Sequence, residues 1–307
     1  MSDIRTRLGP LGIWGGLPLL PAAELRPWAA RAAELGYGSL WVGEGSARDP
    51  FPLLAAIAED SGEMILGTSI VNIFGRDPMA SKMAAMTLHE LTGGRFALGL
   101  GVSHVHLVQK LRGHAYEKPL TRMREYLDAY AELPYRGPVV EDASGAATAP
   151  PLLIAALRTK MLQLAATDTD GTLPYMVTAA RVAWMRSLLD EARPAERAPA
   201  LLVPAVAVVL ESDPGPARER AREYVTPYCR AINYQNSLRE QGFDERDWEP
   251  PYSDRLVDEV VAWGDVDAVA ERLEAYRTAG SDSVAVIPLS TARYRPLDVL
   301  EALAPDS

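Results

Sequence analysis

The sequence has little of what would place the chain in an oxidising compartment, on nucleic acid or in a membrane. Its one cysteine, Cys229, cannot form an internal disulfide, and the first residues, MSDIRTRLGP, lack the apolar run of a signal peptide. The 31 Lys and Arg are outnumbered by 41 Asp and Glu, so no basic stripe is available for a phosphate backbone. The most apolar stretch, 201–210, is too short to span a bilayer and contains Pro204. We therefore expect a cytoplasmic protein that binds neither nucleic acid nor a membrane.

Several common motifs are also missing. GLGVSH (99–104) lacks the third glycine of a dinucleotide fingerprint and follows a fourth strand, so a Rossmann site is not indicated. The sequence has neither a GxSxG elbow nor a P-loop, so no motif indicates a serine hydrolase or a nucleoside triphosphatase. His104 and His106 stand at alternate positions, but no acidic or cysteine partner lies at ligand spacing, so we expect no metal site.

Short apolar runs do alternate regularly with longer segments of helical period, which is typical of parallel strands joined by helical crossovers. The pattern predicts strands at 8–14, 39–44, 64–71, 95–101, 152–157, 171–176, 202–210 and 283–288. It predicts helices at 22–35, 52–60, 78–92, 121–132, 159–167, 179–191, 214–230, 254–263 and 267–279, with a closing helix from Pro296. Residues 137–150 are expected to form a loop.

Eight such units favour an α/β fold of the (β/α)8 TIM-barrel type over an open doubly wound sheet. A chain of 307 residues is within the range of one barrel, so residues 1–307 are expected to form a single domain. The polar loop 103–118, after the fourth strand, and the irregular segment 231–252, after the seventh, are the expected insertions. In a barrel, functional residues gather where the strands end, which points to Trp14, Glu44 and the residues that follow the later strands.

Five stretches in this order resemble the bacterial-luciferase-like oxidoreductases, and specifically their F420-dependent branch. They are LWVGEGSARDPF (40–51), LGTSIVNIFGRDPMA (66–80), LTGGRFALGLGVSHVHLV (91–108), RGHAYEKPLTRMREYL (112–127) and SDRLVDEVVAWGDVDAVAERL (253–273). The ordered set covers most of the chain. The resemblance implies a TIM barrel that binds the deazaflavin F420 across the mouth formed by the carboxyl ends of its strands.

The resemblance also assigns cofactor-binding residues. It implies a non-proline cis peptide between Ser69 and Ile70 that presses on the central ring of the cofactor, with Asn72 in the same segment and Val102 and Ser103 after the fourth strand. Relatives have a small, glycine-bearing turn where this chain has Leu157, and amides of that turn hold the cofactor phosphate. Here the expected phosphate ligands are Arg158, Thr159 and Lys160. Because Leu157 is bulky, the alternative that this turn no longer binds a phosphate also stays open.

Acid and base chemistry has two candidates. Glu44 follows the second strand and could contact the cofactor or shuttle a proton, unless it is only a rim carboxylate paired with Arg48 or Arg76. His104 is the stronger candidate by its intrinsic pKa. The expected substrate-side residues, which could equally be packing residues, are Trp14, Tyr175, Asn233 and Tyr234.

Three functions remain open at this stage. The first is an F420-dependent oxidoreductase that transfers a hydride between the deazaflavin and a small organic substrate. The second is an FMN-dependent monooxygenase of the same fold, and the third is a non-catalytic or cofactor-independent barrel that has lost its phosphate site. Apolar helices at 52–60 and 78–92 suggest a homodimer, and Met83 and Met86 in the latter are expected in the core.

Overall fold

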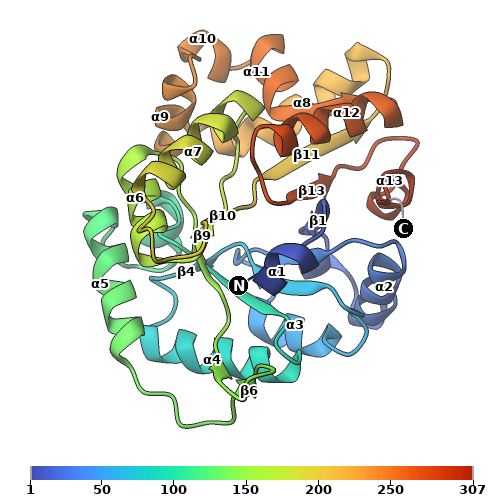
Figure 1. Ribbon diagram of the computed structural model, residues 1–307. Helices are drawn as coiled ribbons and strands as arrows, with labels where there is room; N and C mark the ends of the chain where they lie inside the picture. Colours follow the sequence, from blue (N-terminus) through green and yellow to red (C-terminus); the bar gives the residue numbers. More distant parts are fainter. Residues whose placement is uncertain (1, 306–307) are drawn as a thin grey trace.

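The computed structural model describes residues 2–305, which form a ring of parallel strands surrounded by helices (Figure 1). The strands of the ring are β1 (Leu11–Trp14), β2 (Ser39–Val42), β3 (Ile65–Thr68), β5 (Phe96–Gly101), β8 (Leu152–Ile154), β9 (Gly171–Thr172), β11 (Ala205–Leu210) and β13 (Val284–Pro288). The last strand pairs with the first, Leu11 opposite Val284. The ring closes between β9 and β11, where Tyr175 bridges Ala205. The TIM-barrel prediction is confirmed.

Helices cover the outside of the ring in chain order, as the sequence pattern predicts. They are α2 (Ala22–Glu34), α3 (Pro50–Ile57), α4 (Pro78–Leu91), α5 (Pro119–Glu132), α6 (Thr159–Asp168), α7 (Ala179–Ala192), α8 (Pro214–Cys229), α12 (Val266–Thr278) and α13 (Pro296–Ala302). Asp77 caps α4, and its carboxylate accepts a hydrogen bond from the Ala80 amide at 2.8 Å. None of the helices in the described residues is long and apolar enough to cross a membrane.

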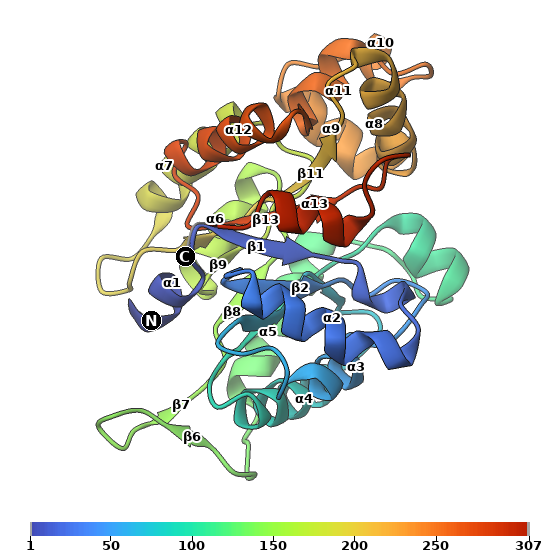
Figure 2. The ribbon, with the colours of Figure 1, turned by 90° about the vertical axis from the view of Figure 1, so that its right-hand side faces the viewer.

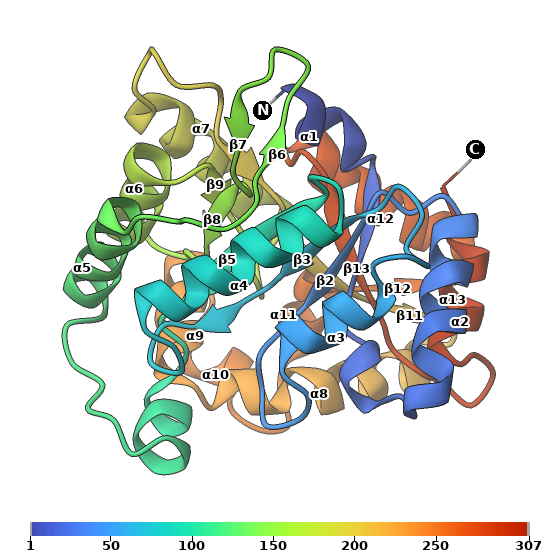
Figure 3. The same ribbon diagram turned by 90° about the horizontal axis from the view of Figure 1, so that it is seen from below.

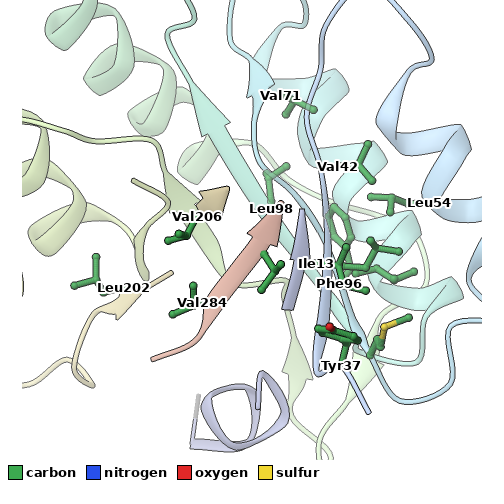
Figure 4. Close-up of a cluster of buried hydrophobic side chains, with 14 of the residues drawn as sticks. Ile13, Tyr37, Val42, Leu54, Val71, Phe96, Leu98, Leu202, Val206 and Val284 are labelled. Atoms are coloured by element: carbon green, nitrogen blue, oxygen red, sulfur yellow. The ribbon is translucent and has the colours of Figure 1, made fainter. Parts of the chain in front are cut away.

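The strands are buried on both faces, because alternate side chains face the helices and the interior of the ring. In β11, Val206 and Val208 join the cluster packed against the helices, whereas Ala207 and Val209 join the cluster that holds Trp41. Figure 4 shows part of the first cluster, with side chains from several strands and from α3. An additional helix, α1 (Ser2–Arg7), contributes Ile4 to the second cluster.

Three segments differ from the sequence prediction. Residues 137–150 contain a hairpin, β6 (Val140–Glu141) with β7 (Ala147–Thr148), which projects from the body in Figure 2. The segment 231–252 is largely helical, with α9 (Ile232–Glu240) and α10 (Glu245–Trp248). The helix expected at 254–263 ends early as α11 (Asp254–Val260), and the chain continues as strand β12 (Val261–Gly264). The apolar residues 260–263 fit the period of a helix as well as that of a strand. The pairing of Val261 with Ala207 of β11 favours the strand.

The predicted strands are shorter in the structure, and two of them are divided. The third breaks after Thr68, and the chain resumes pairing as β4 (Val71–Asn72) against β5. The seventh is divided into β10 (Leu201–Leu202) and β11 around Pro204, which has no N–H to donate to a ladder. Met86 is buried as expected, but Met83 is 50% exposed, so its core assignment is wrong.

Candidate active site

A cavity of about 910 Å³ lies at the carboxyl ends of the barrel strands. Figure 3 shows the helices α8, α9 and α10 at this end of the molecule and the β6–β7 hairpin at the other. Nearly all the predicted site residues line the cavity: Trp14, Glu44, Ser69, Ile70, Val102, Ser103, His104, Arg158, Thr159, Lys160, Tyr175, Asn233 and Tyr234. Asn72 is not among the lining residues. The expected placement of function at the strand ends therefore corresponds to a real cavity.

The peptide bond between Ser69 and Ile70 is cis, as the resemblance implies. Two hydrogen bonds from residues at the ends of β1 and β2 hold it. The Trp14 indole Nε1 donates to the Ser69 carbonyl at 2.9 Å, and the Glu44 amide donates to the Ile70 carbonyl at 3.0 Å. A Cβ added at Gly101 would lie 2.6 Å from the Ile70 side chain, so glycine at that position leaves room for Ile70. The segment forms a fixed part of the cavity wall.

Both carboxylate oxygens of Glu44 are engaged, and the side chain is only 11% exposed. Oε1 accepts a hydrogen bond from the Arg112 guanidinium at 2.7 Å, and Oε2 accepts one from the Asn72 amide at 2.7 Å. Neither of the expected rim partners is used, because Arg48 donates to main-chain carbonyls and Arg76 pairs with Asp49. Glu44 is thereby fixed in place.

Asn72 does not reach the cavity, and its assignment as a cofactor-binding residue is corrected here. The residue is 3% exposed, and its side-chain Oδ1 accepts a hydrogen bond from the Phe74 amide at 2.9 Å. Its role in this site is indirect, since its own amide orients the Glu44 carboxylate.

His104 and Asn233 meet at the cavity although they lie far apart in the sequence. The His104 Nδ1 is 3.0 Å from the Asn233 Oδ1, and the ring lies 5.2 Å from the Tyr234 ring, centroid to centroid. With the amide oxygen as acceptor, Nδ1 carries the proton and Nε2 is left as the basic nitrogen. Desolvation lowers the pKa of His104 below its usual value, and the bond to Asn233 opposes that shift only in part. The neutral imidazole is therefore favoured.

An aromatic wall forms another part of the cavity. The Tyr175 ring is 5.7 Å from Trp14, 4.9 Å from Tyr228 and 6.0 Å from Tyr234, centroid to centroid. Its hydroxyl is hydrogen-bonded to that of Tyr224. Burial raises the pKa of Tyr175 and Tyr224 well above the usual value, so both phenols stay neutral. The wall presents flat, uncharged surfaces to whatever occupies the cavity.

The turn expected to bind phosphate opens helix α6. No side chain of the described residues caps this helix at Arg158, so its first amides are free to bind an anion. Arg158, Thr159 and Lys160 are exposed and line the cavity. The Leu157 carbonyl accepts a hydrogen bond from Arg181 at 2.8 Å, which orients the turn. Leu157 is half-buried; it packs against the core and also lines the cavity beside Arg158.

Sequence reasoning missed several contributors. Arg112 lies in a stretch quoted for the resemblance, but nothing in the sequence links it to Glu44, 68 residues away. Tyr224 and Tyr228 share one face of α8 through their spacing of four residues, a signal that could have been followed from Tyr175. Glu240, which contacts Arg158 and Arg181, lies in the segment expected to be irregular.

No metal centre is indicated in the part of the chain that the structure describes. Groups of three or more His, Cys, Asp or Glu side chains that could hold an ion are absent from residues 2–305. His106 is exposed and is not among the residues that line the cavity.

Comparison with known proteins agrees with the fold. A putative coenzyme F420-dependent oxidoreductase of Mycobacterium tuberculosis is 28% identical over 94% of this chain and 97% of its own length. An F420-dependent secondary alcohol dehydrogenase, solved with an F420-acetone adduct, superposes with a TM-score of 0.73 at 14% identity over 96% of this chain and 98% of that one. The oxygenating component of 3,6-diketocamphane monooxygenase of Pseudomonas putida, solved with FMN, superposes with a TM-score of 0.68 at 16% identity, covering 96% of each chain.

These two solved structures share the fold with this chain. The model of the luciferase-like monooxygenase family matches residues 8–283, a range that holds every residue described above at the cavity. The chain therefore belongs to the luciferase-like monooxygenase family.

Proposed function

We propose that the protein is an F420-dependent oxidoreductase that transfers a hydride between the deazaflavin and a small organic substrate at the mouth of the barrel. The observation that carries the proposal is the cavity of about 910 Å³, which has the cis Ser69-Ile70 segment in its wall and an uncapped, cationic helix start at its edge. The relative with 28% identity, which is named as F420-dependent, supports the same assignment.

The residues present fit such a cofactor. A three-ring system needs a broad apolar wall, which Trp14, Ile70, Val102 and Leu173 supply. Its phosphate needs free amides and cations, which the turn at Arg158 supplies. A bound deazaflavin supplies the hydride chemistry, while the protein supplies position and proton management.

His104 is the residue best suited to move a proton. The bond from Nδ1 to Asn233 orients the ring, and the lowered pKa keeps Nε2 unprotonated near neutral pH. An alcohol whose carbinol carbon gives up a hydride must also lose the proton of its hydroxyl group, and Nε2 can accept that proton and return it in the reverse direction. Glu44 has a different task, because Arg112 and the Asn72 amide occupy both its oxygens. It fixes the loop that holds the Ile70 carbonyl.

A second candidate is an FMN-dependent monooxygenase. The superposition on the FMN-bound oxygenating component supports it, since the two folds extend over nearly the same length. The third candidate is a barrel without a cofactor, and it rests on the bulk of Leu157, which lines the cavity beside Arg158. Failure of both F420 and FMN to bind would support it. A cytoplasmic location and a single domain over residues 1–307 stay predictions.

We also propose a homodimer formed through α4. Met79, Met83 and Leu91 on this helix are 49%, 50% and 56% exposed, and their spacing of four and eight residues places them along one face. Exposed apolar side chains in a row mark an interaction surface more often than isolated ones do.

The test is a titration of the purified protein with F420 and, separately, with FMN, followed by ligand fluorescence. Micromolar or tighter binding of F420 together with weaker binding of FMN supports the proposal and justifies a screen of alcohols and ketones. Tighter binding of FMN transfers the assignment to the monooxygenase. Binding of neither ligand would leave the barrel without a cofactor and overturn both assignments.

A further inference from the structure

One carboxylate lies among the cations of the phosphate turn. Glu240, at the end of α9, lines the cavity beside Arg158, Thr159 and Lys160. Its Oε2 is 2.6 Å from the Arg181 guanidinium, and its Oε1 is 3.7 Å from Nε of Arg158. A site that only had to attract anions would gain nothing from a negative charge at this position.

The two arginines differ in how free they are. Arg181 is 7% exposed, donates to the Leu157 carbonyl and to Glu240, and stacks on Trp184 with its guanidinium 3.7 Å from the ring centroid. Its charge is therefore committed to Glu240 and to the turn. Arg158 is 53% exposed and its contact with Glu240 is longer, so it can still turn toward a ligand.

The charge balance at the turn follows from these contacts. Glu240 neutralises the buried Arg181, which leaves Arg158 and Lys160 for a bound phosphate. The other charged residues that line the cavity, Glu44 and Arg48, belong to the loop after β2. A phosphate group that enters the turn is thus attracted by Arg158 and Lys160, whereas the repulsion from the Glu240 carboxylate offsets the attraction that Arg181 would add.

Phosphate esters differ in charge in a way that such a site can sense. A phosphodiester, as in F420, carries one negative charge, whereas a phosphate monoester, as in FMN, carries between about 1.5 and 2 at neutral pH. Coulomb energy is proportional to the ligand charge, so repulsion from one carboxylate costs the monoester about twice as much as the diester. We propose that Glu240 lowers the affinity of the turn for a phosphate monoester more than its affinity for a phosphodiester. This inference rests on the proposed function and names a residue that shifts the balance between F420 and FMN.

The experiment uses probes that share one ring and differ only in the phosphate. Wild type and Glu240→Gln are titrated at pH 7.5 with riboflavin, with its methyl phosphodiester and with FMN, and F420 is titrated in parallel. Glutamine keeps the shape and an acceptor oxygen for Arg181 while removing the charge. The affinity for riboflavin should not change, that for the diester should rise about threefold, and that for FMN should rise about tenfold.

Two further variants separate charge from folding. Glu240→Asp keeps the charge and should keep the wild-type ratio of diester to monoester affinity. Glu245→Gln removes a neighbouring carboxylate that pairs with Arg239 outside the cavity wall, and it should leave all the affinities unchanged.

If Glu240→Gln increased the affinities for the diester and for FMN by the same factor, or changed neither, the role of Glu240 would be overturned while the assignment of F420 would stand. Failure of F420 and of every flavin to bind to any variant would overturn the proposed function and the role of Glu240 together. If Glu240→Gln did not fold, Glu240→Asp would still test the inference. A ratio of diester to FMN affinity equal to that of wild type would support it, and a changed ratio in this charged variant would overturn it.

Discussion

At the scale of single residues, the ion pair between Glu44 and Arg112 decides how the edge of the cavity is organised. The Glu44 carboxylate is nearly buried, and each of its oxygens accepts one hydrogen bond of 2.7 Å. Removal of the charge leaves a partly buried guanidinium with a neutral partner, and the loop that holds the Ile70 carbonyl loses its restraint.

Glu44→Gln should therefore reduce F420 affinity or turnover at least tenfold, with a loss of unfolding free energy of only about 1 to 2 kcal/mol. Fluorescence titration and urea denaturation measure the two quantities. A matched control is Glu63→Gln, because Glu63 pairs with Arg7 at an exposed position away from the cavity. Unchanged affinity and unchanged turnover in Glu44→Gln would remove Glu44 from the site.

His104 gives the pH dependence. Its pKa is lowered by desolvation, so the folded protein binds a proton less readily than the unfolded chain does. The stability contributed by the neutral ring is present above about pH 6.5, the unfolded value, and is lost as pH falls through the lower folded pKa. Oxidation of an alcohol should likewise fall on the acid side of pH 6.5. The acid limb of the rate profile should disappear in His104→Gln, and a persistent limb would assign the proton transfer to another group.

Most of the predicted residues that line the cavity follow strands, because the ends of parallel strands converge whatever the loops do, whereas Asn233 and Tyr234 reach it from α9. The cis Ser69-Ile70 bond came from the resemblance alone, since no local signal marks it. Arg112 and Glu240 could not be predicted, because their partners are 68 and 59 residues away and only the folded chain joins them.

At the scale of elements, the barrel depends on strands that approach one another without side chains between them. A Cβ on Gly99 of β5 would lie 2.0 Å from the Thr68 carbonyl oxygen of β3, a backbone atom that cannot move aside without disturbing the pairing. The Gly99 amide also donates a hydrogen bond to the Thr68 hydroxyl at 2.9 Å. Glycine at this position is a packing requirement of the sheet.

Gly99→Ala should therefore cost about 3 kcal/mol of unfolding free energy or more. The comparison variant is Gly45→Ala, because a Cβ on Gly45 meets nothing within 4 Å. Urea denaturation of both variants checks the prediction, and equal stability of the two would show that β3 and β5 can separate more readily than their contacts indicate.

The prediction of helices and strands succeeded where the hydrophobic residues followed one period, and it failed where they fitted both the helical and the strand period. The predicted helix 214–230 is observed as α8, and the predicted strand 202–210 is observed mainly as β11. The segment 254–263, predicted as one helix, is apolar enough at its end to be either helix or strand. The helix α9 was missed because its polar face, with Asn233 and Glu240, reads as a loop in isolation. Those polar residues face His104 and the phosphate turn, which are partners the sequence does not place beside them.

At the scale of the whole molecule, the exposed row on α4 bears on assembly. Met83→Glu introduces a charge at the centre of that row and should convert a dimer to a monomer in light scattering or sedimentation, with little change in the stability of the monomer. Leu19→Glu is the control, since Leu19 is 85% exposed on the short helix η1 (Leu17–Leu19), away from α4 in the chain. A monomeric wild type, or a dimer that survives Met83→Glu, would contradict this interface.

The pairing of the first strand with the last has a consequence for biosynthesis. Leu11 leaves the ribosome long before its partner Val284, because most of the barrel lies between them in the sequence. Until β13 arrives, β1 and β11 each carry an unpaired edge, and such edges recruit other chains. The nascent protein therefore exposes an aggregation-prone edge of β1 while all the intervening strands are synthesised.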